Sequence, residues 1–301
     1  MTRPEVTSRP ERTAAAPRLV VTDLDGTLLD RTGNQVSARN LAALNRAAAA
    51  GARVVIATGR PIWWLGPVIA AGFDGIAVCM NGAVVYDVGA RQVVSVRPMT
   101  SQSMQQFVTQ LSALTRQFHV AVERVGTTVA QAWSEPDYVH PWGLGEFRIA
   151  GRAQLLAEPA AKLLIRGSAP SGTLAAAATE AGAAWPGPEQ SDPAGAGTAP
   201  DPTGDHPDRV SVTYSSDDGL VEVAAAGVNK GTALDRLARE WNISAAEAIA
   251  FGDMPNDLEM LSWAGRGVAM GNAHPDVLAV ADETAPHHQA DGVAEVLERW
   301  F

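Results

Sequence analysis

The chain has 301 residues, with 23 Lys and Arg against 33 Asp and Glu, so its formal net charge is -10 at pH 7. A protein that follows the phosphate backbone of a nucleic acid needs a basic face, so this charge argues against nucleic-acid binding as the main task. It does not exclude a small anionic ligand, because a bound metal ion reverses the field locally. The length and the hydrophobic fraction of 46% allow one large or two ordinary domains.

The lysine and cysteine content is unusually low. Lys162 and Lys230 are the only lysines, and Cys79 is the only cysteine. A single cysteine excludes an intramolecular disulfide and indicates a reducing compartment, so the cytoplasm is the expected location. Residues 1–17 lack the apolar run of a secretory signal and are predicted to be a disordered tail. No run of about 18 apolar residues occurs, so no membrane span is expected, and the sequence does not indicate an oligomeric state.

Short apolar runs alternate with helical patterns at the start of the chain. Residues 18–22, 52–57 and 75–80 are predicted strands, and the Ala- and Leu-rich residues 37–50 have helical spacing. Near-continuous apolar strands that are separated by helices are typical of a parallel sheet covered on both faces. The same alternation returns in residues 224–301, so the two ends are predicted to build one α/β domain.

The middle of the chain has a different pattern. Residues 84–223 contain two predicted hairpins, the first over residues 84–96, and helical segments between strand-like runs. This pattern predicts an α+β domain inserted into an α/β core made of residues 18–83 and 224–301. Within the insertion, residues 186–208 are rich in Pro, Gly, Asp and Ala, and we expect a long mobile loop there.

Polar residues follow four of the predicted strands. These segments are residues 23–27, 58–60, 81–82 and 252–257. Ligands bind beyond the carboxyl ends of the strands in open parallel sheets, so Asp23, Asp25, Asp253 and Asp257 are expected to converge. Carboxylates this close remain ionised only beside a cation. Oxygen ligation without His or Cys indicates Mg²⁺.

These residue types suit a phosphoryl group. A metal ion and a lysine neutralise phosphoryl oxygens, while the Thr58 hydroxyl and backbone N–H groups, as in the Gly59 turn, orient them. An aspartate can act as the nucleophile and form an aspartyl-phosphate. A second carboxylate two residues along the chain can protonate the leaving alcohol and later deprotonate water. Asp23 and Asp25 have this spacing.

Six segments carry a family resemblance, in one order along the chain. They are DLDGTLL at 23–29, TGR at 58–60, NG at 81–82, NKG at 229–231, GDMPND at 252–257 and AMGNA at 269–273. Together they resemble the Cof-type phosphatases of the haloacid dehalogenase (HAD) superfamily. The resemblance covers residues 18–83 and 224–301, and it implies a Rossmann-like core with a cap domain of the C2B type over residues 84–223.

The resemblance also implies roles for individual residues. Asp23 is expected to be the nucleophile and a Mg²⁺ ligand. Asp25 is expected to be the general acid and base, with its backbone carbonyl on the metal. Thr58 is expected to bind the phosphoryl group, Lys230 to bind it and to stabilise the negative charges around Asp23, and Asp253 to ligate Mg²⁺.

The remaining residues of the predicted site are implied in the same way. Asn256 and Asp257 are expected to hold ligand or metal-bound water, with Asp257 in the metal set. Asn81 is expected to line the phosphate pocket, and Gly59 belongs to the substrate-binding set. Lys162 has two interpretations: a cap lysine at a position where such proteins often carry one, or a surface lysine with a partly buried stem. The second is favoured.

The leading hypothesis is a Mg²⁺-dependent hydrolase that acts on small phosphomonoesters, such as sugar phosphates or related metabolites, through an aspartyl-phosphate. Phosphoryl transfer to another acceptor, as in a phosphomutase, is an alternative within the same fold. A non-catalytic regulator that binds a phosphorylated metabolite is an alternative from another class, but a pure binder has no need of the Asp23 and Asp25 pair. Specificity is expected to depend on the cap, and the fold alone does not assign a substrate.

Overall fold

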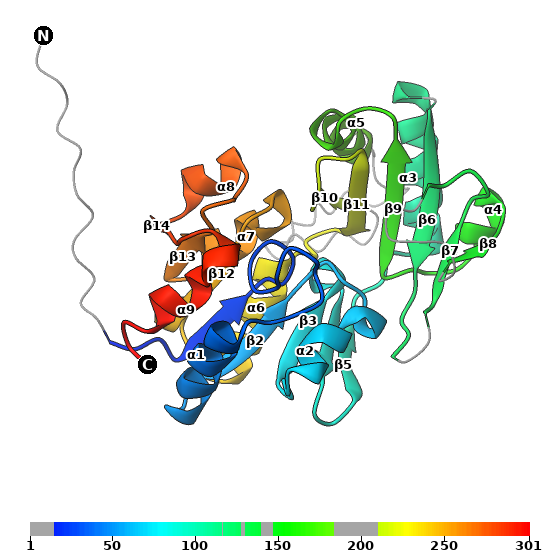
Figure 1. Ribbon diagram of the computed structural model, residues 1–301. Helices are drawn as coiled ribbons and strands as arrows, with labels where there is room; N and C mark the ends of the chain where they lie inside the picture. Colours follow the sequence, from blue (N-terminus) through cyan, green and yellow to red (C-terminus); the bar gives the residue numbers. More distant parts are fainter. Residues whose placement is uncertain (1–14, 116, 128–129, 140–146, 184–209) are drawn as a thin grey trace, which may run out of the picture.

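A computed structural model describes residues 15–301 except for 116, 128–129, 140–146 and 184–209. Most of the tail predicted over residues 1–17, and all of the loop predicted over residues 186–208, lie outside the described residues. The described chain forms an 8-stranded and a 6-stranded sheet. Figure 1 shows the two sheets as separate units, the larger built from both ends of the chain and the smaller from its middle.

The larger sheet has the order β14-β13-β12-β1-β2-β3-β4-β5. Its parallel strands are β1 (Leu19–Thr22), β2 (Arg53–Ala57), β3 (Ile76–Cys79), β12 (Ala248–Gly252), β13 (Arg266–Ala269) and β14 (Glu283–Thr284). The three strands predicted near the start of the chain are confirmed. Strand β1 lies between β2 and β12, so segments from opposite ends of the chain meet at the centre of the sheet.

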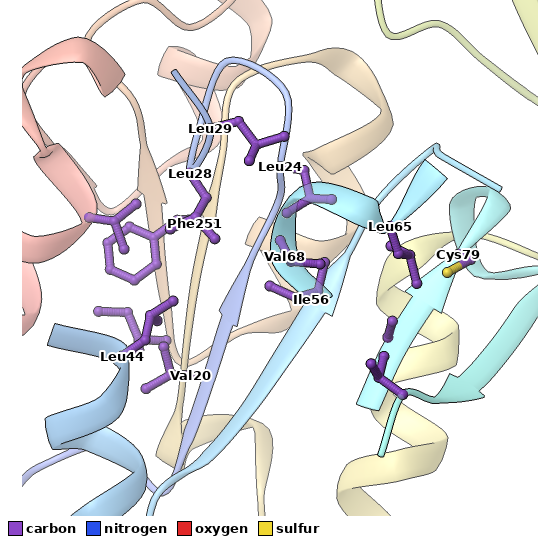
Figure 2. Close-up of a cluster of buried hydrophobic side chains, with 14 of the residues drawn as sticks. Val20, Leu24, Leu28, Leu29, Leu44, Ile56, Leu65, Val68, Cys79 and Phe251 are labelled. Atoms are coloured by element: carbon purple, nitrogen blue, oxygen red, sulfur yellow. The ribbon is translucent and has the colours of Figure 1, made fainter. Parts of the chain in front are cut away.

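Helices cover both faces of this sheet because successive strand residues point to opposite faces. Val20 packs with α1 (Ala38–Ala49), α2 (Gly66–Ala70) and α9 (Gly292–Leu297) in one core, part of which Figure 2 shows. Leu19 and Val21 pack on the other face with α6 (Lys230–Glu240), α7 (Leu258–Trp263) and α8 (Pro275–Val280). Among the described helices, none has the length and apolar character to cross a membrane.

The first predicted hairpin of the insertion belongs to the larger sheet. Strand β4 (Val84–Asp87) pairs antiparallel with β3, and β5 (Gln92–Val96) pairs with β4. The expectation that residues 84–96 lie in the inserted domain is therefore wrong. The reason is the tight 3₁₀ turn at Met80–Gly82, which reverses the chain and places Val84 opposite Cys79.

The inserted segment forms the smaller sheet, in the order β10-β11-β9-β6-β7-β8. Its strands are β6 (Phe118–Glu123), β7 (Ala132–Ser134), β8 (Phe147–Ile149), β9 (Lys162–Gly167), β10 (Val210–Thr213) and β11 (Leu220–Ala225). Helices α3 (Ser101–Leu114) and α5 (Ser171–Ala183) pack on one face through an apolar core, and the short α4 (Arg152–Leu155) lies nearby. The predicted combination of an α/β core and an α+β insertion is confirmed.

Candidate active site

Asp23 lies directly beyond the carboxyl end of β1. Its N–H donates to the carbonyl of Phe251 at 3.0 Å, so sheet pairing extends one residue past the strand and orients the backbone of Asp23. Asp23 is 5% exposed. Asp253 follows the neighbouring strand β12 and is equally buried. The edge of the sheet therefore holds two buried carboxylates from segments far apart in the sequence.

Lys230 is the first residue of α6 and is fully buried. Its Nζ lies 2.7 Å from Asp23 Oδ1 and 2.7 Å from Asp257 Oδ1. The start of the helix is held by a capping box in which Asn229 and Thr232 each bind the other's backbone N–H. The helix start thus places a compact ammonium group between two carboxylates.

Three carboxylates form one cluster. Asp23, Asp253 and Asp257 each offer an oxygen, and these oxygens lie within 4.8 Å of one another. Three negative charges against the single positive charge of Lys230 leave an excess of two. A hard divalent cation fits this donor set, because carboxylate oxygens are the ligands that Mg²⁺ prefers and the charges balance.

Neighbouring donors orient the cluster. Asp257 Oδ2 accepts the N–H groups of Asp253 at 2.9 Å and Met254 at 3.1 Å. Asp253 Oδ1 accepts from the Thr27 hydroxyl at 3.1 Å, and its Oδ2 accepts from Asn272 Nδ2 at 3.2 Å. The carboxylates are therefore held in place by the protein itself.

Gly26 is required by the close approach of Asp253. Its φ is +74°, and a Cβ at this position would lie 2.2 Å from Asp253 Oδ2. Asn272 also donates to the Gly26 carbonyl at 2.8 Å, which ties the turn after β1 to the loop after β13. The glycine of the DLDGT segment thus gives the turn its left-handed conformation and leaves space for the carboxylate.

Asp23 and Asp253 titrate near neutral pH in the absence of a metal ion. Burial and the charges of Asp257 and Asp25 raise the pKa of Asp23 to about 7, although Lys230 opposes the rise. Burial and the neighbouring aspartates raise the pKa of Asp253 to about 8. Burial lowers the pKa of Lys230, but Asp23 and Asp257 outweigh it and the net shift is upward. Lys230 therefore stays charged while Asp23 and Asp253 bind protons.

A pH-dependent response to Mg²⁺ follows from these shifts. The folded protein without Mg²⁺ holds protons on Asp23 and Asp253 up to about pH 7–8, whereas these groups are ionised in the unfolded chain above about pH 4. Their contribution to stability therefore decreases as the pH rises to about 8. Mg²⁺ needs the ionised forms, so the Tm increase it causes should grow from about pH 6 to about pH 8.5. At 100 times its Kd the ion adds about 2.7 kcal/mol.

Thermal unfolding in EDTA and in Mg²⁺ at the two pH values measures this response. At each pH, groups that titrate elsewhere affect the Tm equally in EDTA and in Mg²⁺, so their contribution cancels in the difference. A Tm increase that is equal at both pH values, or no increase at either, would contradict the assignment of the cluster as a metal site.

The predicted phosphoryl-binding residues lie beside the carboxylates. Thr58 follows β2 and is buried, and its hydroxyl accepts the N–H of Arg60 at 3.1 Å. The Asn81 N–H donates to the Thr58 carbonyl at 3.1 Å, and Asn256 Nδ2 donates to Asn81 Oδ1 at 3.1 Å. The structure thus brings Thr58, Gly59, Asn81 and Asn256 into one contiguous group.

Asp25 lies outside the three-carboxylate cluster. Both of its carboxylate oxygens accept from Arg60, Oδ2 from Nε at 2.7 Å and Oδ1 from Nη2 at 2.5 Å. Arg60 Nη2 also donates to the Gly33 carbonyl at 2.8 Å. The expectation that four carboxylate side chains converge is thus wrong for Asp25, because the planar guanidinium offers it a bidentate partner. The side chain of Asp25 is 55% exposed.

Three residues of the site were not predicted individually from the sequence. Arg60 is the third residue of the TGR segment, and Thr27 and Asn272 lie in the DLDGTLL and AMGNA segments. The segments that carry the resemblance were therefore a usable signal for these three. Lys162 is 4% exposed and ion-paired, so the favoured interpretation of a surface lysine is wrong.

The sequence model of haloacid dehalogenase-like hydrolases matches residues 20–165 and 203–297. The chain belongs to this family. A 5-amino-6-(5-phospho-D-ribitylamino)uracil phosphatase of Bacillus subtilis is 40% identical over 82 residues, which is 27% of this chain and 30% of that protein. An HMP-PP phosphatase of Serratia proteamaculans is 41% identical over 95 residues, 31% of this chain and 34% of that protein. These two alignments span about a third of the relatives' length.

A pyridoxal phosphate phosphatase of Escherichia coli aligns over nearly the whole chain, with 29% identity over 282 residues, 93% of this chain and 97% of that protein. A solved HAD-superfamily phosphatase from Bacteroides thetaiotaomicron has a TM-score of 0.73 and 22% identity, covering 98% of this chain and 99% of that one. A sugar phosphatase of HAD subclass IIB has a TM-score of 0.69 and 19% identity, covering 93% and 98%. The structural similarities confirm that the HAD fold extends over both sheets.

Proposed function

We propose that this HAD-family chain is a Mg²⁺-dependent phosphatase that hydrolyses small phosphomonoesters through an aspartyl-phosphate at Asp23. The observation that carries the proposal is the buried Lys230, which lies 2.7 Å from Asp23 and 2.7 Å from Asp257 within a carboxylate cluster that has two uncompensated negative charges. A site of this kind neutralises a phosphoryl group while it presents a carboxylate oxygen as the nucleophile.

Asp23, Asp253 and Asp257 would hold the metal ion, together with the backbone carbonyl of Asp25 that the resemblance implies. The donor set of buried carboxylates supports this assignment. When bound, Mg²⁺ neutralises the charge of phosphoryl oxygens and so lowers the repulsion between the phosphoryl group and a carboxylate nucleophile.

The proposed reaction has two steps. A carboxylate oxygen of Asp23 attacks phosphorus, the bond from phosphorus to the leaving oxygen breaks, and Asp25 donates a proton to that oxygen. Asp25 then accepts a proton from water, whose oxygen attacks phosphorus, and the bond between Asp23 and phosphorus breaks to release inorganic phosphate. In both steps the ammonium group of Lys230 stabilises the negative charge of Asp23 and of the phosphoryl group. Asp25 must leave Arg60 to act, and its exposed side chain allows this movement.

The phosphoryl oxygens would be oriented by groups that already lie together. These are the Thr58 hydroxyl, the Gly59 backbone, and the side chains of Asn81 and Asn256. Such preorganised donors favour the transition state because they need no rearrangement during the reaction.

The inserted unit would act as the cap. Because β4 and β5 pair with the larger sheet, we place the cap at residues 97–223 and the catalytic core at residues 18–96 and 224–301. The relatives are named as phosphatases of 5-amino-6-(5-phospho-D-ribitylamino)uracil, HMP-PP and pyridoxal phosphate, and a structural neighbour as a sugar phosphatase. These names support a small phosphorylated metabolite as the substrate.

A screen of phosphorylated metabolites with Mg²⁺ tests this proposal. We expect stoichiometric release of inorganic phosphate from at least one sugar phosphate, vitamin phosphate or related ester, with kcat/KM of about 10⁴ M⁻¹s⁻¹ or more. Isomerised sugar phosphate in place of free phosphate would indicate a phosphomutase. Ligand binding without turnover across the panel would indicate a regulator.

A further inference from the structure

Three charged side chains are buried on one face of the smaller sheet, apart from the carboxylate cluster. Glu123, Lys162 and Glu222 come from the neighbouring strands β6, β9 and β11 and are 1%, 4% and 3% exposed. The residues next to them, such as Val122 and Leu163, point to the opposite face and pack in the core with α3 and α5. The three charged residues therefore lie on the face that these helices leave free.

The ammonium group of Lys162 contacts two carboxylates and a backbone carbonyl. Its Nζ lies 2.7 Å from Glu222 Oε1 and 3.2 Å from Glu123 Oε2. Its Nζ also donates to the backbone carbonyl of Gly59 in the larger unit, at 2.7 Å. Burial lowers the pKa of Lys162, but the two glutamates outweigh it and raise the pKa to about 12, so the lysine stays charged.

Glu222 extends the same network into the site. Its Oε2 accepts from Asn81 Nδ2 at 3.1 Å, and Asn81 Oδ1 accepts from Asn256 Nδ2 at 3.1 Å. Gly59 packs against these groups, since a Cβ there would lie 3.1 Å from Asn81 Oδ1 and 3.4 Å from Glu222 Oε1. Charged residues of the inserted unit thus contact both loops that are proposed to bind the phosphoryl group.

The loop at Asn81 has a backbone that needs such support. Met80 and Asn81 have φ angles of 50° and 54°, a left-handed conformation that persists only where the surroundings hold it. Their N–H groups donate to the carbonyls of Arg60 and Thr58, each at 3.1 Å. Lys162 donates to the carbonyl of Gly59, so the carbonyls of residues 58, 59 and 60 each accept a hydrogen bond. The donor to residue 59 is the one that comes from the inserted unit.

We propose that Lys162 and Glu222 form a latch that positions the phosphoryl-binding loops through Gly59 and Asn81. The latch makes phosphoryl affinity depend on how the inserted unit is seated on the core. Both are positioning residues, because they act through the loops and not on the reacting atoms. The inference rests on the proposed function for the identity of the bound group.

A stability effect must be separated from a positioning effect. Removing Lys162 alone takes away the cation that pairs with the buried Glu222 at 2.7 Å, and breaking a buried ion pair from one side destabilises a fold strongly. The double variant Lys162→Met/Glu222→Gln also removes the charge of Glu222 and keeps an acceptor for Asn81, so it should be more stable than Lys162→Met. Arg166→Met is the matched control, since Arg166 lies on the same strand and pairs with Asp218 at 2.9 Å.

The experiment measures p-nitrophenyl phosphate hydrolysis with Mg²⁺ and inhibition by inorganic phosphate, well below the Tm of each variant. We expect kcat/KM to fall by about 10- to 100-fold and the phosphate inhibition constant to rise by about 10-fold or more in both Lys162 variants. The Arg166 variant should stay within about twofold of the parent protein. If the Lys162 variants have a lower Tm but the same kcat/KM and the same phosphate inhibition constant as the Arg166 control, the latch would be overturned.

Isothermal titration of inorganic phosphate into the protein with Mg²⁺ distinguishes failure of the latch from failure of the proposed phosphatase function. A parent protein that binds phosphate but hydrolyses no ester contradicts the proposed function alone, and weaker phosphate binding in the Lys162 variants would still support the latch. Equal phosphate binding by the parent protein and by the double variant would overturn the latch, whatever the activity.

Discussion

Replacing Asp23 with asparagine is expected to reduce phosphate release by about 10⁴-fold or more, the order of loss that follows removal of a covalent nucleophile. The amide keeps the shape of the side chain and an oxygen that can accept from Lys230, which lies 2.7 Å from Asp23 Oδ1. It cannot attack phosphorus. Because burial already raises the pKa of Asp23 to about 7, the neutral amide should leave the stability in EDTA at about pH 8 unchanged or higher.

Single-turnover phosphate release and urea unfolding measure the two effects of Asp23→Asn. Asp87→Asn is a matched control on β4, because Asp87 accepts the N–H of Ala90 at 2.7 Å and takes no part in the cluster. We expect the control to keep its activity within about twofold. An Asp23→Asn protein with parental activity would remove Asp23 from the role of nucleophile.

Replacing Lys230 with methionine should reduce both activity and stability. Lys230 is fully buried between Asp23 and Asp257, and its loss leaves three clustered carboxylates without a cation. Breaking a buried pair of this kind costs about 3–5 kcal/mol. Loss of a preorganised charge at the phosphoryl group should lower kcat by about 10²- to 10³-fold.

The destabilisation caused by Lys230→Met should depend on conditions. It should be largest in EDTA at about pH 8.5 and smaller with Mg²⁺ or at about pH 6, because a cation or protons then relieve the repulsion. Urea unfolding under these conditions measures it. Arg239→Met on the same helix is the control, since its pair with Asp235 is on the surface and should contribute about 0.5 kcal/mol or less. A Lys230 variant as stable and as active as the control would contradict the proposed charge balance.

The parallel core could be predicted because its signals are local. Apolar runs end at Asp23, Thr58 and Asp253, and strand ends of one parallel sheet meet at one edge. The same rule predicted that Asp257 lies near Asp23, whereas the position of Lys230 beside Asp23 was implied only by the family resemblance. The HAD fold and the inserted α+β unit are both confirmed.

The parts that could not be predicted depend on partners far along the chain. Lys162 bonds to groups 60 and 103 residues away, so nothing in its own segment distinguishes it from a surface lysine. Asp25 meets Arg60 35 residues later, and a pattern of acidic residues at strand ends does not show which carboxylate an arginine will take. Strands β4 and β5 have a hairpin pattern that fits either sheet, and the turn at Met80–Gly82 decides between them.

The central claim is that Asp23 becomes phosphorylated during turnover. The most direct measurement is to quench the Mg²⁺-loaded protein during steady-state hydrolysis of p-nitrophenyl phosphate, reduce it with borohydride, which converts an aspartyl-phosphate to homoserine, and locate the product by peptide mass spectrometry. We expect homoserine at position 23, and none in Asp23→Asn or without substrate. Homoserine at another aspartate, or full turnover with no homoserine at position 23, would contradict the account.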